Sequence, residues 1–238
     1  MATPFMQSTI TIDGRTVPIN MRINRRAKRI ILRIDRLHSS VTITVPSERR
    51  VKEALSFAET RRAWIKAQLE NAARPSPFQD GTQFPLRGQK TDIVHVSKAT
   101  HAIELDTDNR RLLVSGDTPH INRRVTDWLK RQARIDLTAR ADIHAETLGV
   151  QRGGIRIRDT KSRWGSCSSS GHLSFSWRLI LAPSWILDYV AAHECAHLLH
   201  LDHSPAYWRT LKKTGVDARA AKIWFDENGA DLFVWGVV

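Results

Sequence analysis

Two histidines and a glutamate in the C-terminal third of the chain have the spacing of a metal site. They form the pattern His193-Glu194-Cys195-Ala196-His197, written HExxH. On a helix, side chains four residues apart lie about 6 Å from each other on one face, so both imidazoles can reach one tetrahedral zinc ion. Glu194 can then act on a metal-bound water. The alternative is that these are ordinary surface or core histidines of an amphipathic helix.

A catalytic zinc ion usually takes three protein ligands and leaves a fourth position open, so a third ligand is expected nearby. His200 lies seven residues beyond His193, which is about 10 Å along a straight helix. His203 is favoured instead, because the run LDHSP indicates that the helix has ended and Pro205 supports that stop. Glu227 is the alternative ligand if the site uses a downstream carboxylate.

The chain has two cysteines, Cys167 and Cys195, so neither a disulfide framework nor a four-cysteine zinc ribbon is expected. This agrees with a reducing compartment. Cys195 lies two residues from each helix histidine and should point toward the core. Cys167 is interpreted as a small buried residue, but it is also the one candidate for a fourth ligand that would close the site and make it purely structural.

The N-terminal part is predicted to be a small sheet followed by a helix. Apolar and polar residues alternate in short runs over 8–45, which is typical of half-buried strands. Apolar residues recur at helical spacing from Ser47 to about Ala73, and the run ARPSPFQDG then predicts a linker or long turn. We therefore expect an N-terminal portion over 1–75 and a catalytic portion over 80–238, or one continuous domain.

The remainder alternates strand and helix patterns, and no internal repeat is evident at periods of about 20–50 residues. One long amphipathic helix is expected from about Asn122 to Thr147, and another helix begins near Pro183 and Ser184. The fold class is thus α+β. The predicted strands cover 91–96, 101–106, 111–116, 154–159 and 172–177, with a turn-rich segment at 162–171.

The chain is strongly basic, with 37 Lys and Arg against 24 Asp and Glu and a net charge of +13. Residues 21–36 and 119–163 carry a net +6 each. Arg163, with Arg156, Arg158 and Lys161 before it, leads into the motif-rich region and could hold an anionic substrate. Because 21–36 contains no aromatic residue for base stacking, nucleic-acid contact there would be to phosphates and largely sequence-blind. The alternative is a solvated face that aids solubility.

Two polar residues near the histidines have two interpretations each. Tyr207 could polarise a substrate carbonyl, or it could simply pack. Asp202 could accept a hydrogen bond from a ligand imidazole, or it could be a solvated turn residue.

No secretory signal is evident, since the N-terminus MATPFMQSTI has neither a basic start nor an apolar core. The most apolar stretch, 180–192, is interrupted by Pro183 and Asp188 and is shorter than the ~20 residues that cross a bilayer. A cytoplasmic protein without membrane contact is expected.

The run Arg163-Trp164-Gly165-Ser166-Cys167, with SFSWRLILAPSWILDYVAAHECAHLLHLDHSPAYW behind it, resembles the YgjP-type metallopeptidase-domain family. The resemblance extends from RINRRAKRIILRI through RRAWI to the region of Trp224. It implies a zincin-like fold in which His193, His197 and His203 hold Zn²⁺ and Glu194 is the general base. The chain departs from the family pattern at Tyr207, where phenylalanine is expected, and at Asp202, where asparagine is commoner.

The expected function is therefore a zinc-dependent metallopeptidase in which Glu194 activates a zinc-bound water. Two alternatives remain. The resemblance also implies a metal-dependent nucleoside triphosphate pyrophosphatase, whose phosphates the basic segments would hold. The family is similar in outline to SprT-type, DNA-associated proteases, which suggests a nucleic-acid-associated protease, although the cysteine-based zinc ribbon of many such proteins is absent.

Overall fold

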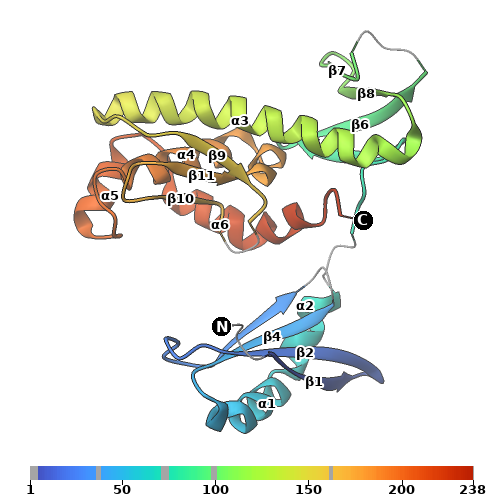
Figure 1. Cartoon of the computed structure of the whole chain (residues 1–238), viewed down its shortest axis with the longest axis vertical. Helices are drawn as coiled ribbons and strands as arrows, with labels where there is room; N and C mark the ends of the chain where they lie inside the picture. Colours follow the sequence, from blue (N-terminus) through green and yellow to red (C-terminus); the bar gives the residue numbers. More distant parts are fainter. Residues whose placement is uncertain (1–4, 36–38, 71–74, 98–100, 161–162, 238) are drawn as a thin grey trace. The chain divides into compact units, whose positions relative to one another are not determined.

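The computed structural model describes residues 5–35, 39–70, 75–97, 101–160 and 163–237. The chain forms two compact units, Met1–Pro75 and Ser76–Val238. Each combines strands and helices (Figure 1), so the α+β class is as predicted. Among the described residues, no helix is long and apolar enough to cross a membrane.

The N-terminal unit is a four-stranded sheet with two helices. Its strand order is β1-β2-β4-β3, in which β2 and β4 are parallel and the two outer pairs are antiparallel. Alternate apolar side chains of the strands pack against Ala54, Ala58 and Ile65 of the helices, which gives this unit its own core. The elements are β1 (Phe5–Ile12), β2 (Arg15–Ile23), β3 (Ile31–Asp35), β4 (Ser40–Val45), η1 (Glu48–Arg50), α1 (Val51–Thr60) and α2 (Arg62–Glu70).

The helix predicted over Ser47–Ala73 is divided at Arg61, whose backbone leaves the helical region at φ −101° and ψ 11°. The apolar spacing does not detect this break, because Ala58 and Ile65 are seven residues apart, about two helical turns. The last residues of that prediction, 71–74, lie outside the described residues.

The C-terminal unit begins with a second four-stranded sheet, ordered β5-β6-β8-β7. Its first residues, 76–82, lie outside the helices and strands, in line with the predicted linker or long turn, but part of this stretch packs into the core. Phe78 is buried and stacks on Trp235 with ring centroids 6.2 Å apart. The elements are β5 (Gln83–Leu86), β6 (Gln89–Val96), β7 (Ile103–Asp106), β8 (Arg111–Ser115), η2 (Thr118–His120) and the long helix α3 (Ile121–Leu148).

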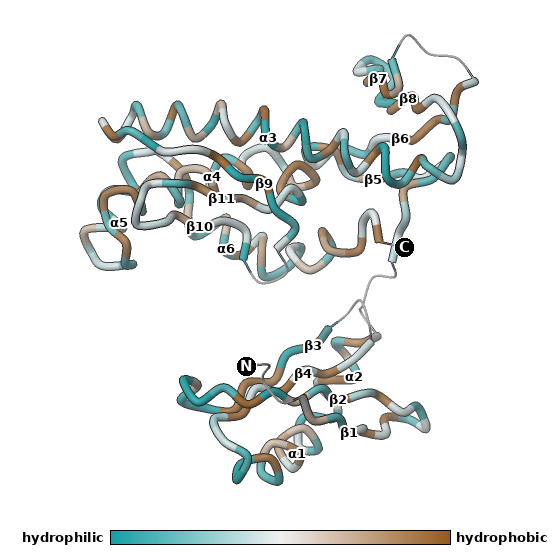
Figure 2. The backbone as a smooth tube through the Cα atoms, in the orientation of Figure 1, coloured by the Kyte–Doolittle hydropathy of each residue, from teal (hydrophilic) through white to brown (hydrophobic). Residues whose placement is uncertain are grey.

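Helix α3 was predicted almost to its ends. Apolar residues recur along its length (Figure 2), and Val125, Leu129, Ala133 and Leu137 are buried. A left-handed glycine, Gly149, ends it. The helix is the main support for α4, and both belong to the larger core.

The site elements come after α3 in the chain. A three-stranded sheet, ordered β10-β11-β9, lies beside α4. Strand β10 falls inside the segment predicted to be turn-rich. The elements are β9 (Ile155–Arg158), β10 (Gly165–Cys167), β11 (Leu173–Ser176), η3 (Trp177–Leu181), α4 (Ser184–Ala196), α5 (Pro205–Lys212), α6 (Ala218–Asn228) and η4 (Gly229–Phe233).

The turn between β5 and β6 fixes the start of α4. Arg87 and Gly88 have positive φ, and their amides donate to the carbonyls of Ile180 and Leu181. A Cβ at Gly88 would lie 2.9 Å from atoms of Pro183, so this approach requires glycine.

Candidate metal centre

Helix α4 carries the HExxH pattern at its C-terminal end. The helix ends at Ala196, and His197 is its C-cap residue. Its apolar side chains, including Ile186, Leu187 and Val190, anchor it in the core. The rings of His193 and His197 lie with centroids 4.9 Å apart, as expected for side chains on one helical face.

His203 returns to these two histidines after the helix has ended. Its Nε2 lies 3.3 Å from Nε2 of His193. One ring nitrogen from each of His193, His197 and His203 lies within 4.8 Å of the others. In the part of the chain that the structure describes, this is the one such group of His, Cys, Asp or Glu, and neither the exposed Glu227 on α6 nor Cys167 belongs to it.

The helix has ended before the run LDHSP, as predicted, but the role of Pro205 differs from its sequence-based interpretation. The helix has already ended at Ala196, and Pro205 is instead the first residue of α5, a position that favours proline. His200 faces away from the cluster because its Nε2 contacts Thr210 Oγ1 at 3.1 Å, not because a straight helix separates it from His193. Asp202 accepts from the backbone N–H of Ser204 at 3.3 Å, as a turn residue does.

Two of the histidines are oriented through Nδ1. His197 Nδ1 donates to the carbonyl oxygen of His200 at 2.8 Å, which leaves Nε2 as the lone-pair nitrogen. His193 Nδ1 lies 2.6 Å from the Tyr207 hydroxyl, and that hydroxyl donates to the carbonyl of His193 at 3.3 Å. A hydroxyl that accepts from Nδ1–H and donates to the carbonyl leaves His193 Nε2 free in the same way.

The environment keeps these histidines neutral. Burial, with smaller contributions from the charges of His197 and His203, lowers the pKa of His193 to about 4. Burial also lowers the pKa of His197. A neutral imidazole is the form that binds a metal ion, so the lowered pKa values of His193 and His197 favour metal binding at neutral pH.

Glu194 is buried beside the cluster and touches strand β10. A Cβ added at Gly165 would lie 2.8 Å from the Glu194 carboxyl carbon and 2.7 Å from its Cγ, so glycine is what leaves room for this side chain. Burial raises the pKa of Glu194 to about 8, and the positive charge of Arg163 opposes that rise. A nearby cation would favour the carboxylate form.

A polar cleft of about 350 Å³ opens beside Gly165. Two arginines, Arg158 and Arg163, line it together with Thr160, Ser166 and Ser174. The Arg163 side chain is exposed and acts electrostatically on Glu194, so this cleft is next to the buried carboxylate. Of the two residues expected to contact substrate, Arg163 therefore lines a cleft, whereas Tyr207 is fully buried against His193.

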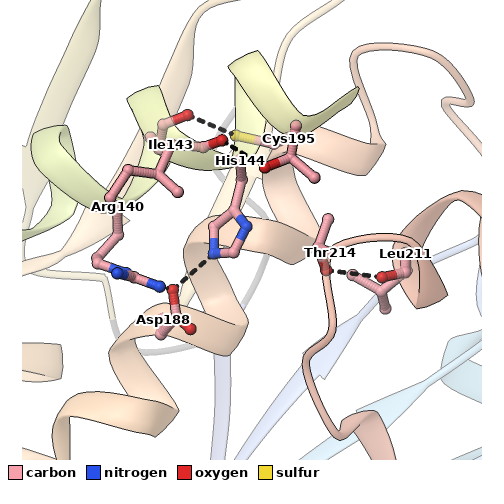
Figure 3. A network of polar contacts seen from close by, with 9 residues as sticks. Arg140, Ile143, His144, Asp188, Cys195, Leu211 and Thr214 are labelled. Carbon is pink, nitrogen blue, oxygen red and sulfur yellow. Dashed lines mark hydrogen bonds and ion pairs between the residues drawn. The ribbon is translucent and has the colours of Figure 1, made fainter. Parts of the chain in front are cut away.

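The two free thiols differ in burial. Cys195 points into the core, as predicted, and its Sγ donates to the carbonyl oxygen of Ala141 at 3.4 Å (Figure 3). Cys167 is partly buried, and burial followed by the charge of Glu194 raises its pKa. Its thiol is thus protonated at neutral pH, unlike a thiolate ligand.

A partly buried polar network joins α3 to α4 five residues before His193 (Figure 3). Arg140 Nε and His144 Nε2 each donate to Asp188 Oδ1 at 2.6 Å. Burial opposes the ionisation of Asp188, but hydrogen bonds from His144 and Arg140 outweigh it and hold the pKa below its ordinary value. Sequence patterns alone did not identify these residues. The signal for Arg140 and His144 was their spacing of four on one face of α3.

One family of known proteins matches most of the chain. A family model described as "YgjP-like, metallopeptidase domain" matches residues 28–228. Among solved structures, the metallopeptidase zymogen abylysin of Pyrococcus abyssi is 25% identical over 39% of this chain and 92% of that chain, with a TM-score of 0.35. A TM-score this low does not establish a common fold. No match was found among curated proteins.

Proposed function

We propose that this chain, a metal-dependent hydrolase that belongs to the YgjP-like metallopeptidase-domain family, is a zinc peptidase whose general base is Glu194. The observation that carries the proposal is the convergence of His193, His197 and His203 beside one buried carboxylate. The fold and family support a metal site, and the chemistry of the side chains supports zinc.

The donor set fits zinc. Three neutral imidazoles form a usual ligand set for catalytic Zn²⁺, whereas Mg²⁺ and Ca²⁺ prefer oxygen ligands. The Nδ1 partners of His193 and His197 leave both Nε2 atoms available. Because the described residues add no fourth ligand to the group, the arrangement favours a catalytic site over a closed structural one.

A bound Zn²⁺ supplies a Lewis acid that makes water a stronger acid and polarises the substrate carbonyl. Glu194 takes the proton of the attacking water on its carboxylate and delivers it to the leaving amine. Because Gly165 has no side chain, the carboxylate of Glu194 can occupy this position beside β10. The buried setting of Glu194 keeps its proton affinity high enough for both transfers.

Substrate is proposed to enter by the cleft along β10, where Arg158 and Arg163 face solvent. The same two arginines support a second candidate function, hydrolysis of a nucleoside triphosphate, because guanidinium groups bind phosphates in a bidentate manner. Two free thiols, Cys167 and Cys195, suit a reducing compartment such as the cytoplasm.

The test is hydrolysis by zinc-loaded protein of an unfolded protein substrate and a nucleoside triphosphate panel in parallel. Glu194→Gln should lower peptide cleavage by about 10² to 10⁴-fold, the usual contribution of a general base, while zinc content stays near one equivalent. Glu227→Gln is the matched control, because this exposed glutamate lies on α6 outside the cluster, and it should leave cleavage unchanged.

The outcomes separate the functions. Glu194-dependent release of phosphate or pyrophosphate without peptide cleavage would replace the peptidase proposal with a nucleotide hydrolase. A Glu194→Gln protein that cleaves peptides at the wild-type rate would refute the assigned base.

A further inference from the structure

The N-terminal unit contains a groove that the metal centre does not use. Its volume is about 550 Å³, and it is lined by the five consecutive residues 29–33 and by Phe57, Arg61 and Trp64. All of these residues lie within Met1–Pro75. The groove is therefore a feature of this unit alone.

The groove runs along the open edge of a sheet. Strand β3 is the last in the order β1-β2-β4-β3 and pairs only with β4 among the described strands. Three of the five consecutive lining residues, 31–33, belong to β3. Because successive strand residues point to opposite faces, a groove that touches all three follows the edge of the strand rather than one face. Such an edge presents unpaired backbone N–H and C=O groups to another strand.

The opposite wall is formed by the helices. Phe57, Arg61 and Trp64 have the spacing i, i+4, i+7 and share one side of the α1–α2 pair. The Arg61 guanidinium lies 5.5 Å from the centre of the Phe57 ring. Trp64, the one tryptophan within residues 1–75, is 44% exposed, an unusual position for so large an apolar side chain.

This unit also carries most of the chain's net positive charge. Residues 1–75 contain 15 Lys and Arg against 6 Asp and Glu, a net +9, whereas residues 76–238 contain 22 against 18, a net +4. Within the described ranges, Arg29, Arg33 and Arg61 form no ion pair with a carboxylate. The groove thus offers three exposed guanidinium groups to an anionic ligand.

We propose that this groove binds an extended acidic peptide segment, which pairs with the edge of β3 and recruits substrate to the peptidase. The recruitment of substrate rests on the proposed function, whereas the binding of the peptide does not. Backbone groups of β3 would form hydrogen bonds with the peptide main chain, and the arginines would bind its carboxylates. Trp64 and Phe57 would contact an apolar side chain of the peptide. The peptide main chain would pair along residues 31–33, the part of β3 that lines the groove.

The lining favours a peptide over two other occupants. A nucleic acid strand could stack on Trp64, but its backbone has no amide N–H and C=O groups that could pair with a strand edge. The apolar side chains of Ile30, Ile31 and Leu32 cannot bind its phosphates. A second copy of this chain would place Arg29 and Arg33 against their own equivalents and oppose two units of net +9.

The experiment measures binding by fluorescence anisotropy to full-length Glu194→Gln protein, so that no turnover is needed. The probe is a labelled peptide of about twelve residues that alternates Glu and Val. This probe should bind at least ~10-fold more tightly than either of two control peptides. One control has Gln in place of each Glu and so lacks the negative charges. The other has Pro at alternate positions, and proline cannot donate a hydrogen bond to a strand ladder.

Charge-matched variants locate the binding. Arg29→Glu with Arg33→Glu should weaken the acidic peptide by at least ~10-fold. Arg15→Glu with Lys52→Glu makes the same charge change at exposed positions outside the groove and should have little effect. Trp64→Phe should keep binding but remove the part of the tryptophan fluorescence change that the peptide produces.

Three outcomes would overturn the proposal. The first is that both double variants weaken binding of the acidic peptide equally. The second is that the proline peptide binds as tightly as the probe. The third is that an oligothymidylate binds more tightly than the probe and displaces it from the groove. None of them bears on whether Glu194 supports peptide cleavage, which the proposed-function assay measures separately.

Discussion

The two four-stranded sheets of this protein share one topology. Their orders, β1-β2-β4-β3 and β5-β6-β8-β7, correspond strand by strand, and in each the central pair is parallel and the outer pairs are antiparallel. Each is succeeded in the chain by a 3₁₀ turn and then by a helix. Corresponding strands are separated by about 70 to 80 residues, a longer period than the 20–50 residues at which no repeat was evident.

The helical segments behind the two sheets differ. After the first sheet, the helical segment breaks at Arg61 and leaves a basic, aromatic groove beside the edge strand. After the second, α3 runs unbroken for 28 residues and supports α4, which carries His193 and His197. The shared sheet therefore determines no chemistry by itself, because function depends on the elements packed against it.

The largest effect expected from this division is loss of the metal centre without any change in the groove. His197→Ala removes one of three ligands, so bound zinc and hydrolysis should both be lost, with activity at least ~10³-fold below wild type. Binding of the acidic probe peptide should be unchanged, because the groove lies in the other unit. Metal analysis, cleavage and anisotropy on one preparation test this.

His101→Ala is the control, since this exposed histidine comes after β6 and lies outside the cluster. Wild-type zinc content in His197→Ala protein would contradict the ligand assignment. Lost peptide binding in the same protein would contradict the functional division between the units.

The next effect concerns how tightly the catalytic carboxylate is enclosed, in contrast to the open groove of the first unit. A Cβ at Gly165 would lie 2.8 Å from the Glu194 carboxyl carbon, so Gly165→Ala should displace the general base. We expect kcat to fall about 10²-fold with zinc retained, because misplacing a catalytic group by about 1 Å lowers the rate by about this factor. Steady-state kinetics with metal analysis measure both.

Gly154→Ala is the matched control. A Cβ there would meet His172 Nδ1 at 3.4 Å, an ordinary contact, so its activity should stay near wild type. Unchanged kcat in Gly165→Ala would mean that Glu194 does not need this space.

Sequence reasoning reached the residues whose chemistry is local. Spacing within HExxH placed His193 and His197 together, and periodicity predicted α3 to within one residue at each end. It could not find the role of Gly165, because Glu194 lies 29 positions away and only folding brings them into contact. Likewise, the basic segment 21–36 contains no aromatic residue of its own, and only folding places Trp64 in the same groove as residues 29–33.

The errors in the fold have a common cause. The patterns record which residues are apolar, but not where hydrogen bonds are made. The ladder that makes β10 a strand is formed with β11, so its Ser- and Gly-rich run gave no sign of it. The burial of Phe78, in the stretch predicted to be a linker or long turn, depends on Trp235, which lies far along the chain. Pro205 does not end α4, which stops at Ala196, but is the first residue of α5.

A smaller effect is expected at the hydroxyl that orients His193. Tyr207→Phe removes the contact of that hydroxyl with Nδ1, and partners of this kind usually contribute about 10 to 100-fold to metal affinity. Zinc affinity measured by competition with a chelator should fall by about that factor. At saturating zinc, kcat should recover, which a merely unfolded protein would not show. Unaltered affinity would make Tyr207 a packing residue only.

The smallest effect is a difference in acid stability between the two regions. In the N-terminal unit, the carboxylates with lowered pKa values, Asp13 and Glu53, are exposed and contribute little. In the C-terminal unit, burial opposes the ionisation of Asp188, but hydrogen bonds from His144 and Arg140 lower its pKa. The folded state therefore holds this proton less tightly than the unfolded chain does, so the stabilisation is complete above the ordinary carboxyl pKa of about 4 and is lost as pH falls through the lower folded value.

Asp188→Asn should consequently cost about 1 to 2 kcal/mol of unfolding free energy at pH 7 and progressively less below about pH 4. Urea unfolding at a series of pH values, monitored by the tryptophans of the C-terminal unit, measures this difference. Asp13→Asn is the control and should leave the curve unchanged at every pH, because its partner Lys66 is on the surface. If Asp188→Asn lost the same stability at pH 3 as at pH 7, the carboxylate charge would not be what ties α4 to α3.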